Sequence, residues 1–282
     1  MAITEGDLAF VESLAREAGA LLMRYRQDGF TISHKAAINL VTTADHESER
    51  LIVGALSARY PSHVIISEEA WPSSSPVVHF DGGEQEPVLS GIDKTPPMDG
   101  DDIWYIDPLD GTTDFVHGYP VFAVSIALYQ NAQPLLGVIY DPIRDELFSA
   151  QRGAGAWLNG QPICVSQTRS LIASLLTSGF PYDVHESGSN IAAYQQLTLL
   201  SRGVRISGSA ALDLAWVACG RLDGYWEAEI APWDGAAGAL LVREAGGCVS
   251  DYEAQAWQPT MASVVATNRW LHEALLKEIA VG

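Results

Sequence analysis

The sequence predicts an α/β fold built from two closely packed lobes, and three observations lead to this fold class. Apolar residues recur at helical spacing over residues 8–25. Between residues 104 and 163, β-prone apolar runs alternate with closely spaced turn signals, as in an antiparallel meander. After about residue 166, strand-like and helix-like segments alternate. We therefore expect an α+β N-terminal lobe with an antiparallel sheet over residues 1–165 and an α/β C-terminal lobe over residues 166–282.

Several elements of the N-terminal lobe precede the meander. The helix over 8–25 follows Thr4–Asp7, which is a weak form of the capping box. Residues 30–41 predict a strand or a hairpin, and a second helix is expected to follow Asp45. The apolar run at 64–67 predicts a short buried strand, which would deliver the acidic residues that come directly after it.

The elements of the C-terminal lobe are predicted from short segments that differ in periodicity. The segments expected to alternate between strand and helix are 171–177, 191–200, 204–207, 210–218, 225–227 and 235–244. The last of these helices ends at Gly246–Gly247, because glycine is a common helix stop. Small residues at 236–238 would allow this helix to approach a neighbour closely.

The composition is that of an ordinary globular protein with an excess of acid. The chain is 48% hydrophobic and 18% charged, which is unlike a disordered protein. Acidic residues number 35 and basic residues 16, and the formal net charge of −19 argues against nucleic acid as the main partner. The acidity reflects either a salty or acidic habitat or a soluble, self-repelling surface, and we favour the second explanation.

Cysteine spacing and hydropathy bear on the compartment. Cys164, Cys219 and Cys248 are widely spaced and form no CxxC motif, which is typical of reduced core residues in a cytosolic protein. The N-terminal residues lack the basic and apolar regions of a signal peptide. No apolar stretch approaches the roughly 20 residues that a membrane span needs. We expect a soluble, cytoplasmic protein with no membrane partner.

Residues 71–102 differ from the rest of the chain. They are rich in Ser, Pro, Gly and Asp, and acids far outnumber the single lysine, Lys94. This composition predicts a long excursion over the surface. It is either a mobile flap near the functional site or a solvated insertion without function.

The segment at 104–112 holds the most informative chemistry. An apolar, β-prone run ends in Asp107 and Asp110, and the proline between them favours extended backbone before it. Gly111 permits a tight turn, and Thr112 is a suitable N-cap for a following helix. Two carboxylates on such a turn suit Mg²⁺ better than zinc or copper. The backbone N–H groups that follow could bind a phosphate.

Other acidic residues each have an ordinary explanation beside a functional one. Asp234 precedes the helix predicted at 235–244 and could be its N-cap or a metal ligand. Glu68 and Glu69 follow a buried strand and could be solvated loop residues or ligands. Asp45 could cap the helix that follows it. Taken together and in this order, these acids point to a functional cluster.

The order of these motifs resembles the inositol monophosphatase family, whose members are Mg²⁺-dependent, lithium-sensitive phosphatases. The motif Asp-Pro-x-Asp-Gly-Thr is found at 107–112 and Trp-Asp-x-Ala-Ala-Gly at 233–238. Segments 115–120 and 208–213 also look like bacterial members, and the likeness extends over nearly the whole chain. The resemblance implies a layered αβαβα sandwich of the sugar phosphatase type and a homodimer.

The resemblance also implies two to three Mg²⁺ ions in each active site. The implied ligands are Glu68, Asp107, the main-chain carbonyl of Leu109, Asp110 and Asp234. The first ion would be bound by Glu68, Asp107 and Leu109, and the second by Asp107, Asp110 and Asp234. A third, looser ion would share Glu68 and waters.

Catalytic and substrate-binding roles follow from the same resemblance. Asp45 and Thr112 would form a hydrogen-bonded pair that orients and deprotonates a metal-bound water, and Glu68 is also implied as a catalytic residue. Direct attack of that water would hydrolyse a phosphate monoester without a phosphoenzyme. The implied substrate-binding residues are Asp110, Gly111, Thr112, Gly208, Ser209, Ala210 and Glu227.

The most favoured substrate is inositol-1-phosphate, since a glutamate such as Glu227 accepts hydrogen bonds from polyol hydroxyls. Histidinol phosphate, fructose 1,6-bisphosphate, NADP and 3′-phosphoadenosine 5′-phosphate remain alternatives with the same chemistry. An alternative of another class is a regulatory protein that binds the transcription machinery, as some bacterial members do. The chain departs from the family pattern at Ser67, Asp114 and Ser209, where glycine, asparagine and threonine are more usual.

Overall fold

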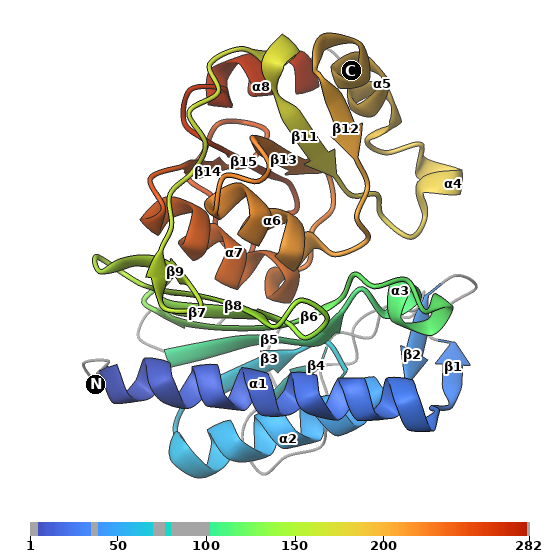
Figure 1. Cartoon of the computed structure of the whole chain (residues 1–282), viewed down its shortest axis with the longest axis vertical. Coiled ribbons are helices and arrows are strands. Elements are labelled where there is room, and N and C mark those ends of the chain that lie inside the picture. The colour runs from blue at the N-terminus through green and yellow to red at the C-terminus, as the bar shows by residue number, and fades with distance from the viewer. Residues whose placement is uncertain (1–4, 35–38, 70–76, 80–101, 281–282) are drawn as a thin grey trace.

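Helical and sheet layers alternate in the order helix, sheet, helix, sheet, helix (Figure 1). The computed structural model describes residues 5–34, 39–69, 77–79 and 102–280. Apolar clusters join each sheet to the helices on both of its faces. This arrangement confirms the α/β class and the αβαβα sandwich expected from the sequence.

The first outer layer contains α1 (Glu5–Asp28) and α2 (Thr43–Arg59), joined by a hairpin of β1 (Ile32–His34) and β2 (Leu40–Thr42). Apolar side chains of both helices are buried against the larger sheet, as the helical spacing predicted. The second helix begins earlier than expected. Thr42 is its N-cap, and it forms a capping box with Asp45 inside the first turn.

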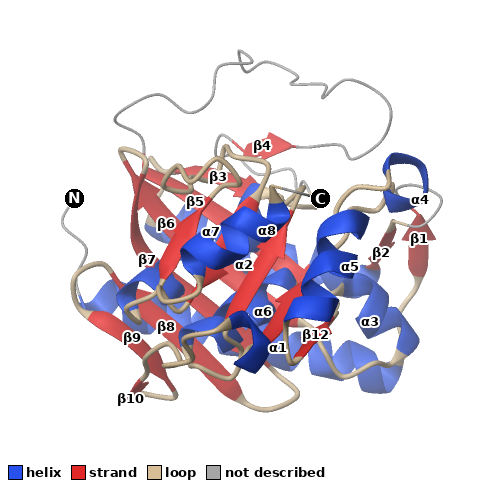
Figure 2. Cartoon of the chain, turned by 90° about the horizontal axis from the view of Figure 1, so that it is seen from above, coloured by secondary structure: helices blue, strands red, loops and turns tan. Residues whose placement is uncertain are grey.

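The larger sheet has eight strands in the order β10-β9-β8-β7-β6-β5-β3-β4. Its strands are β3 (Val64–Ser67), β4 (Val77–His79), β5 (Asp102–Asp110), β6 (Ala123–Gln130), β7 (Gln133–Asp141), β8 (Glu146–Gln151), β9 (Gly155–Leu158) and β10 (Gln161–Pro162). Strands β5 to β10 pair antiparallel, which confirms the predicted meander, and β5 to β8 lie side by side in Figure 2. Strand β3 pairs in parallel with β5 on one side and with β4 on the other.

The acidic segment 71–102 is described only at its strand β4 and at Asp102, where β5 begins. Strand β4 lies on the edge of the larger sheet, so this short stretch is part of the sheet and not of a surface excursion. The rest of the segment lies outside the described residues, and both explanations of it stay predictions.

The remaining layers come from the second half of the chain. Helices α6 (Ala210–Ala218) and α7 (Pro232–Glu244) form the middle layer, and α5 (Ile191–Leu200) and α8 (His272–Ile279) form the outer one. The smaller sheet has the order β12-β11-β13-β15-β14. Its strands are β11 (Leu175–Ser178), β12 (Gly203–Arg205), β13 (Gly224–Glu227), β14 (Cys248–Ser250) and β15 (Val264–Thr267).

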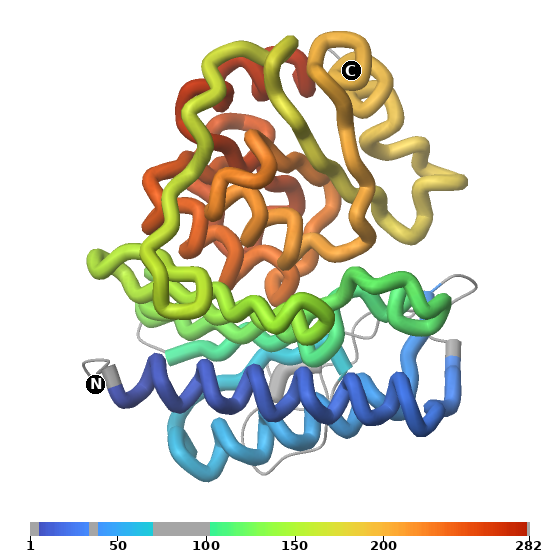
Figure 3. The backbone as a smooth tube through the Cα atoms, viewed as in Figure 1, coloured from blue at the N-terminus to red at the C-terminus, as the bar shows by residue number. Residues whose placement is uncertain are grey.

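Three short helices complete the described elements: α3 (Thr112–His117), the 3₁₀ helix η1 (Leu171–Ala173) and α4 (Val184–Ser187). The strand expected over 171–177 was wrong at its start, because η1 occupies 171–173 and β11 begins only at Leu175. The chain thus runs from α1 in one outer layer to α8 in the other (Figure 3). Within the described residues, no helix combines the length and the apolar character that a membrane crossing requires. The lobe boundary near residue 165 stays a prediction.

Helix α7 approaches both of its neighbours closely because it carries small residues. A Cβ added to Gly238 would lie 2.4 Å from the Leu214 side chain of α6. A Cβ added to Gly137 of β7 would lie 2.9 Å from the backbone oxygen of Ala237. The close approach predicted for this helix is therefore confirmed, and any added methyl group here would push two layers apart.

We expect Gly238→Ala to lower the free energy of unfolding by about 1–3 kcal/mol, because the new methyl overpacks the contact with Leu214. The matched control is Gly54→Ala in the exposed part of α2, where no atom lies within 4 Å of the added Cβ. That control should stabilise the protein by about 0.5–1 kcal/mol, since glycine is a poor helix former. Denaturant unfolding of the three proteins measures both effects, and equal stability of both variants would contradict the packing argument.

Candidate active site

The acidic motif 107–112 forms the end of β5 and the turn after it. The pairing of β5 with β6 shifts register between Asp107 and Asp110, which is a bulge next to the carboxylates. Asp107 accepts a hydrogen bond from the backbone N–H of Leu109 at 3.0 Å. The strand continues to Asp110, so Asp107 lies within the strand. Thr112 is not the N-cap of α3, because Gly111 takes that position with a positive φ of 92°.

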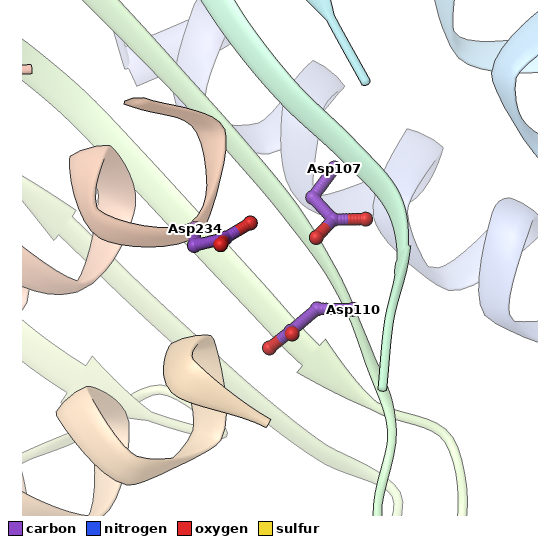
Figure 4. Close-up of side chains that lie close together, drawn as sticks. All are labelled: Asp107, Asp110 and Asp234. Atoms are coloured by element: carbon purple, nitrogen blue, oxygen red, sulfur yellow. The ribbon is translucent and has the colours of Figure 1, made fainter. Parts of the chain in front are cut away.

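Asp234 approaches the two β5 carboxylates from α7. One oxygen from each of Asp107, Asp110 and Asp234 lies within 4.8 Å of the others, and the three side chains face one another in Figure 4. The N-cap of α7 is Ala231, and Asp234 lies inside the first turn. The interpretation of Asp234 as a helix cap was therefore wrong, and its carboxylate instead belongs to the cluster.

Burial and mutual repulsion act on this cluster together. Burial, followed by the charges of Glu68, Asp110 and Asp234, raises the pKa of Asp107 well above its usual range. Burial also raises the pKa of Asp234 well above its usual range and that of Asp110 to about 6. Such a group of hard oxygen donors fits a divalent cation, which would relieve the repulsion and favour the ionised carboxylates.

Asp110 is held by the N-terminal end of α6, which belongs to the second half of the chain. Its Oδ2 accepts hydrogen bonds from the Ser209 hydroxyl at 2.5 Å and from the backbone N–H of Ala211 at 2.8 Å. Ser209 is also the N-cap of α6 and accepts from the N–H of Leu212. The hydroxyl predicted to line the substrate wall thus also fixes one member of the acidic cluster.

Asp45 and Thr112 are brought together as expected, although they are far apart in the sequence. The Thr112 hydroxyl lies 2.9 Å from Asp45 Oδ1 and 3.0 Å from the carbonyl oxygen of Leu109. Asp45 Oδ2 accepts from the Thr42 hydroxyl at 2.5 Å. Burial raises the pKa of Asp45 to about 6, against the opposing hydrogen bond from Thr42. A carboxyl with this pKa can exchange a proton near neutral pH.

Two adjoining cavities contain the remaining predicted residues. The smaller has a volume of about 230 Å³ and is lined by Glu68 together with the acidic cluster, Leu109, Gly111 and Thr112. The larger has a volume of about 560 Å³ and is lined by Asp110, Gly111, Thr112, Gly208, Ser209, Ala210, Glu227 and Asp234, among others. The structure therefore gathers the predicted site residues around these two cavities. Asp45 does not line either cavity, but its carboxylate accepts a hydrogen bond from Thr112, which lines both.

Glu227 lies at the carboxyl end of β13, next to the carboxyl end of the parallel strand β11. It accepts a hydrogen bond from the Tyr225 hydroxyl and is 9% exposed. Burial raises its pKa to about 7. Ligands of open α/β sheets bind at the carboxyl ends of parallel strands, which agrees with this position.

Sequence reasoning missed several residues that line these cavities. Tyr182 lines both of them and comes from the loop after β11. Asp213 lines the larger cavity and is 2% exposed. The signal for Tyr182 was the Gly-Phe-Pro-Tyr run directly after a buried strand, which places a side chain at a strand's carboxyl end.

The sequence model of the inositol monophosphatase family matches residues 5–281. The chain belongs to the inositol monophosphatase family. It is 44% identical over 243 residues to a Synechocystis protein named inositol-1-monophosphatase, covering 86% of this chain and 77% of the relative. It is 40% identical over 265 residues to Nus factor SuhB of Escherichia coli, covering 93% and 91% of the two chains.

A solved structure of inositol monophosphatase from Anabaena (Nostoc) shares the fold. Its TM-score with this chain is 0.80 at 40% sequence identity, over 97% of this chain and 95% of that one. Membership of the inositol monophosphatase family makes this protein a metal-dependent phosphoric monoester hydrolase. The acidic cluster on β5 and α7 is the part of the structure that could hold the metal.

We expect replacement of Asp107 by Asn to stabilise the metal-free protein at pH 7.5. Asp110 has a pKa of about 6 in the folded state against 3.8 ordinarily, so folding favours its protonated form. This contribution to stability is fully present below about pH 4 and is lost as the pH rises through about 6. Asp107 behaves in the same way, because burial and the charges of Glu68, Asp110 and Asp234 raise its pKa well above the usual range. Replacing it by Asn removes the cost of ionising this carboxyl in the folded protein, about 1–2 kcal/mol at pH 7.5.

Denaturant unfolding in the presence of a chelator measures this difference at pH 7.5 and at pH 5. The advantage of the variant should shrink at the lower pH, because the wild-type carboxyl groups are then protonated. A metal-free wild type that is more stable than Asp107→Asn at pH 7.5 would contradict the repulsion argument.

Proposed function

We propose that this inositol monophosphatase family member hydrolyses inositol-1-phosphate to inositol and phosphate with Mg²⁺ as its cofactor. The proposal rests on the cluster of Asp107, Asp110 and Asp234, which lies beside a cavity that Glu227 also lines. The cluster suits a metal that contacts phosphate, and the wall suits an alcohol with several hydroxyls. The name of the Synechocystis relative supports the choice of substrate.

The metal ligands are part of the proposal. Glu68, Asp107 and the carbonyl of Leu109 would bind one Mg²⁺, and Asp107, Asp110 and Asp234 a second. Glu68 would also take part in binding a third. When bound, Mg²⁺ lowers the pKa of the attacking water and neutralises charge on the phosphoryl oxygens. Glu68 lines the same small cavity as the three aspartates, which supports this assignment.

The chain's own acid–base chemistry rests on Asp45 and Thr112. The Thr112 hydroxyl has one hydrogen and two acceptors in reach, Asp45 Oδ1 and the Leu109 carbonyl. When it donates to Asp45, its own oxygen is free to accept a proton from the attacking water. Asp45, with a pKa of about 6, would store that proton, while Thr42 holds its second oxygen in place.

Substrate binding is divided between the two walls of the site. The backbone N–H groups of Gly111 and Thr112 at the start of α3 would hold the phosphate. Glu227 and the wall at 208–210 would contact the hydroxyls of the alcohol, and Asp110 would contact both metal and substrate. Histidinol phosphate, fructose 1,6-bisphosphate, NADP and 3′-phosphoadenosine 5′-phosphate remain alternatives. The last three carry additional phosphate, which the carboxylates of the larger cavity disfavour.

Several further properties belong to the proposal because the family resemblance implies them. We include inhibition by lithium, assembly as a homodimer and a cytoplasmic location. The three cysteines are free, which agrees with a reducing compartment. The expectation that they are core residues was wrong, because Cys164 is exposed and Cys219 and Cys248 are only partly buried.

A second function is suggested by the name of the relative Nus factor SuhB from Escherichia coli. We propose that this chain, in addition to its catalytic activity, makes a regulatory contact with the transcription machinery. Stoichiometric recovery of RNA polymerase with the tagged protein would support that contact, and its absence from the eluate would remove it.

The central experiment measures phosphate release from inositol-1-phosphate with and without Mg²⁺. We expect Mg²⁺-dependent turnover in the wild type and a loss of at least about 10³-fold in Asp107→Asn, since this carboxylate is assigned to two metal ions. The matched control is Glu273→Gln on the exposed face of α8, which removes one negative charge far along the chain from the site residues and should keep full activity.

Thr112→Val tests the proton relay separately from the metal site. We expect a fall in kcat of about 10²–10⁴-fold with a smaller change in KM, because the variant lacks the hydroxyl but leaves the metal carboxylates in place. Metal affinity, measured by calorimetry, should remain close to that of the wild type. Full kcat in this variant would contradict the role given to Thr112.

A further inference from the structure

The two cavities of the site share part of their lining, and the shared residues mark where the cavities meet. The residues that line both are Asp110, Gly111, Thr112, Tyr182, Ala231 and Asp234. The proposed function places the phosphate beside the acidic cluster of the smaller cavity and the alcohol in the larger one. The oxygen that bridges phosphorus and carbon in a bound ester would therefore lie at this junction.

Two hydroxyl groups belong to the shared lining, and they differ in what they already bind. The Thr112 hydroxyl is within hydrogen-bond reach of Asp45 and of the Leu109 carbonyl. The Tyr182 hydroxyl has no hydrogen-bond partner among the described residues. A phenolic hydroxyl is protonated at neutral pH and donates one hydrogen bond. Tyr182 therefore carries the hydroxyl that remains available to a ligand at the junction.

The Tyr182 hydroxyl lies close enough to the acidic residues of the site for their charges to act on it. Burial of the hydroxyl end, followed by the charges of Glu68, Asp234, Asp107 and Asp110, raises the pKa of Tyr182 well above its usual range. The residue as a whole is nevertheless 50% exposed. Tyr182 thus brings its hydroxyl near the acids while the rest of the side chain stays open to a ligand.

The loop that carries Tyr182 is fixed at its start. The side-chain amide of Asn190 donates to the Ser178 hydroxyl at 2.7 Å and to the carbonyl oxygen of Gly179 at 2.6 Å. A Cβ added to Gly179 would lie 2.3 Å from Glu227 Oε2, so the loop packs directly on the glutamate that lines the larger cavity. These contacts position the loop before a substrate binds, and preorganised donors are the effective ones in catalysis.

We propose that the Tyr182 hydroxyl donates a hydrogen bond to the oxygen that bridges phosphorus and the alcohol carbon, which makes Tyr182 a catalytic residue. Negative charge develops on this oxygen as its bond to phosphorus breaks, and a donor aimed at it stabilises that charge. Tyr182 keeps its own proton, and the departing oxygen takes its proton from solvent water. This inference rests on the proposed phosphatase function and adds to it a residue for the departure of the alcohol.

Tyr182→Phe tests the inference because it removes the hydroxyl and keeps the ring. We expect kcat for inositol-1-phosphate with Mg²⁺ to fall about 10–100-fold with a smaller change in KM, because the hydrogen bond strengthens as the alkoxide forms. An aryl ester, p-nitrophenyl phosphate, releases a phenolate whose charge is delocalised over the ring. Its kcat should therefore fall less than about threefold, since this leaving group needs little stabilisation.

Two further variants and a binding measurement make the result specific. Tyr119→Phe removes a hydroxyl from an exposed tyrosine that lines neither cavity, and it should keep full activity with both esters. Tyr182→Leu also lacks the hydroxyl and should show the same selective loss for inositol-1-phosphate, so the test does not depend on one variant. Calorimetry should give the wild-type number of bound Mg²⁺ ions in Tyr182→Phe, because the carboxylates are unchanged.

The outcomes separate this inference from the proposed function. An unchanged kcat in Tyr182→Phe, with a wild type that hydrolyses inositol-1-phosphate, overturns the inference alone. An equal loss for both esters overturns the assignment to the bridging oxygen. Loss of a bound Mg²⁺ ion in Tyr182→Phe would make the hydroxyl a metal ligand and also overturn it. Absence of inositol-1-phosphate hydrolysis by the wild type would overturn the proposed function itself.

Discussion

The structure depends most on the burial of mutually repelling carboxylates where β5 meets α7. Burial raises the pKa of Asp107, Asp110 and Asp234 and so disfavours their ionised forms, yet a metal binds them only when they are ionised. The surrounding elements resolve part of this conflict. Ser209 and Ala211 donate to Asp110, and Leu109 donates to Asp107. The layers on either side supply the rigidity that keeps the acids together, so stability gained elsewhere supports a site that is unfavourable in itself.

Those features that depend on short stretches of sequence could be predicted well. The meander after residue 104 and the helices at 191–200 and 210–218 have the expected type and position, because periodicity and turn residues act locally. Asp107 and Asp110 belong to one short motif, so their carboxylates could be expected to lie close together. Asp45 and Thr112 could be paired only through the family resemblance, since their contact joins separate elements.

The helix caps show why local rules fail at a functional site. Thr112 has the side chain of an N-cap, but its hydroxyl contacts Asp45 and the Leu109 carbonyl instead. Asp234 lies inside the first turn of its helix and faces other acids. Asp45 occupies position N3 of a capping box whose N-cap is Thr42. For Thr112 and Asp234, contacts with other elements take the place of the local capping hydrogen bond. Tyr182 and Asp213 were missed for a related reason, because the adjacency of strands β11 and β13 is not visible in one sequence.

The division of the site between two walls separates reaction from recognition. The carboxylates that suit a metal lie on β5 and α7, whereas Glu227 and Asp213 come from β13 and α6. Ser209 is the point of contact, since one hydroxyl orients Asp110 and lines the larger cavity. A change on the recognition wall can therefore alter the preferred alcohol while the hydrolytic groups keep their geometry. Asp114 stands where the family more usually has asparagine, and it joins the two walls: it comes from α3, which begins at Thr112, and its carboxylate lies against Gly208.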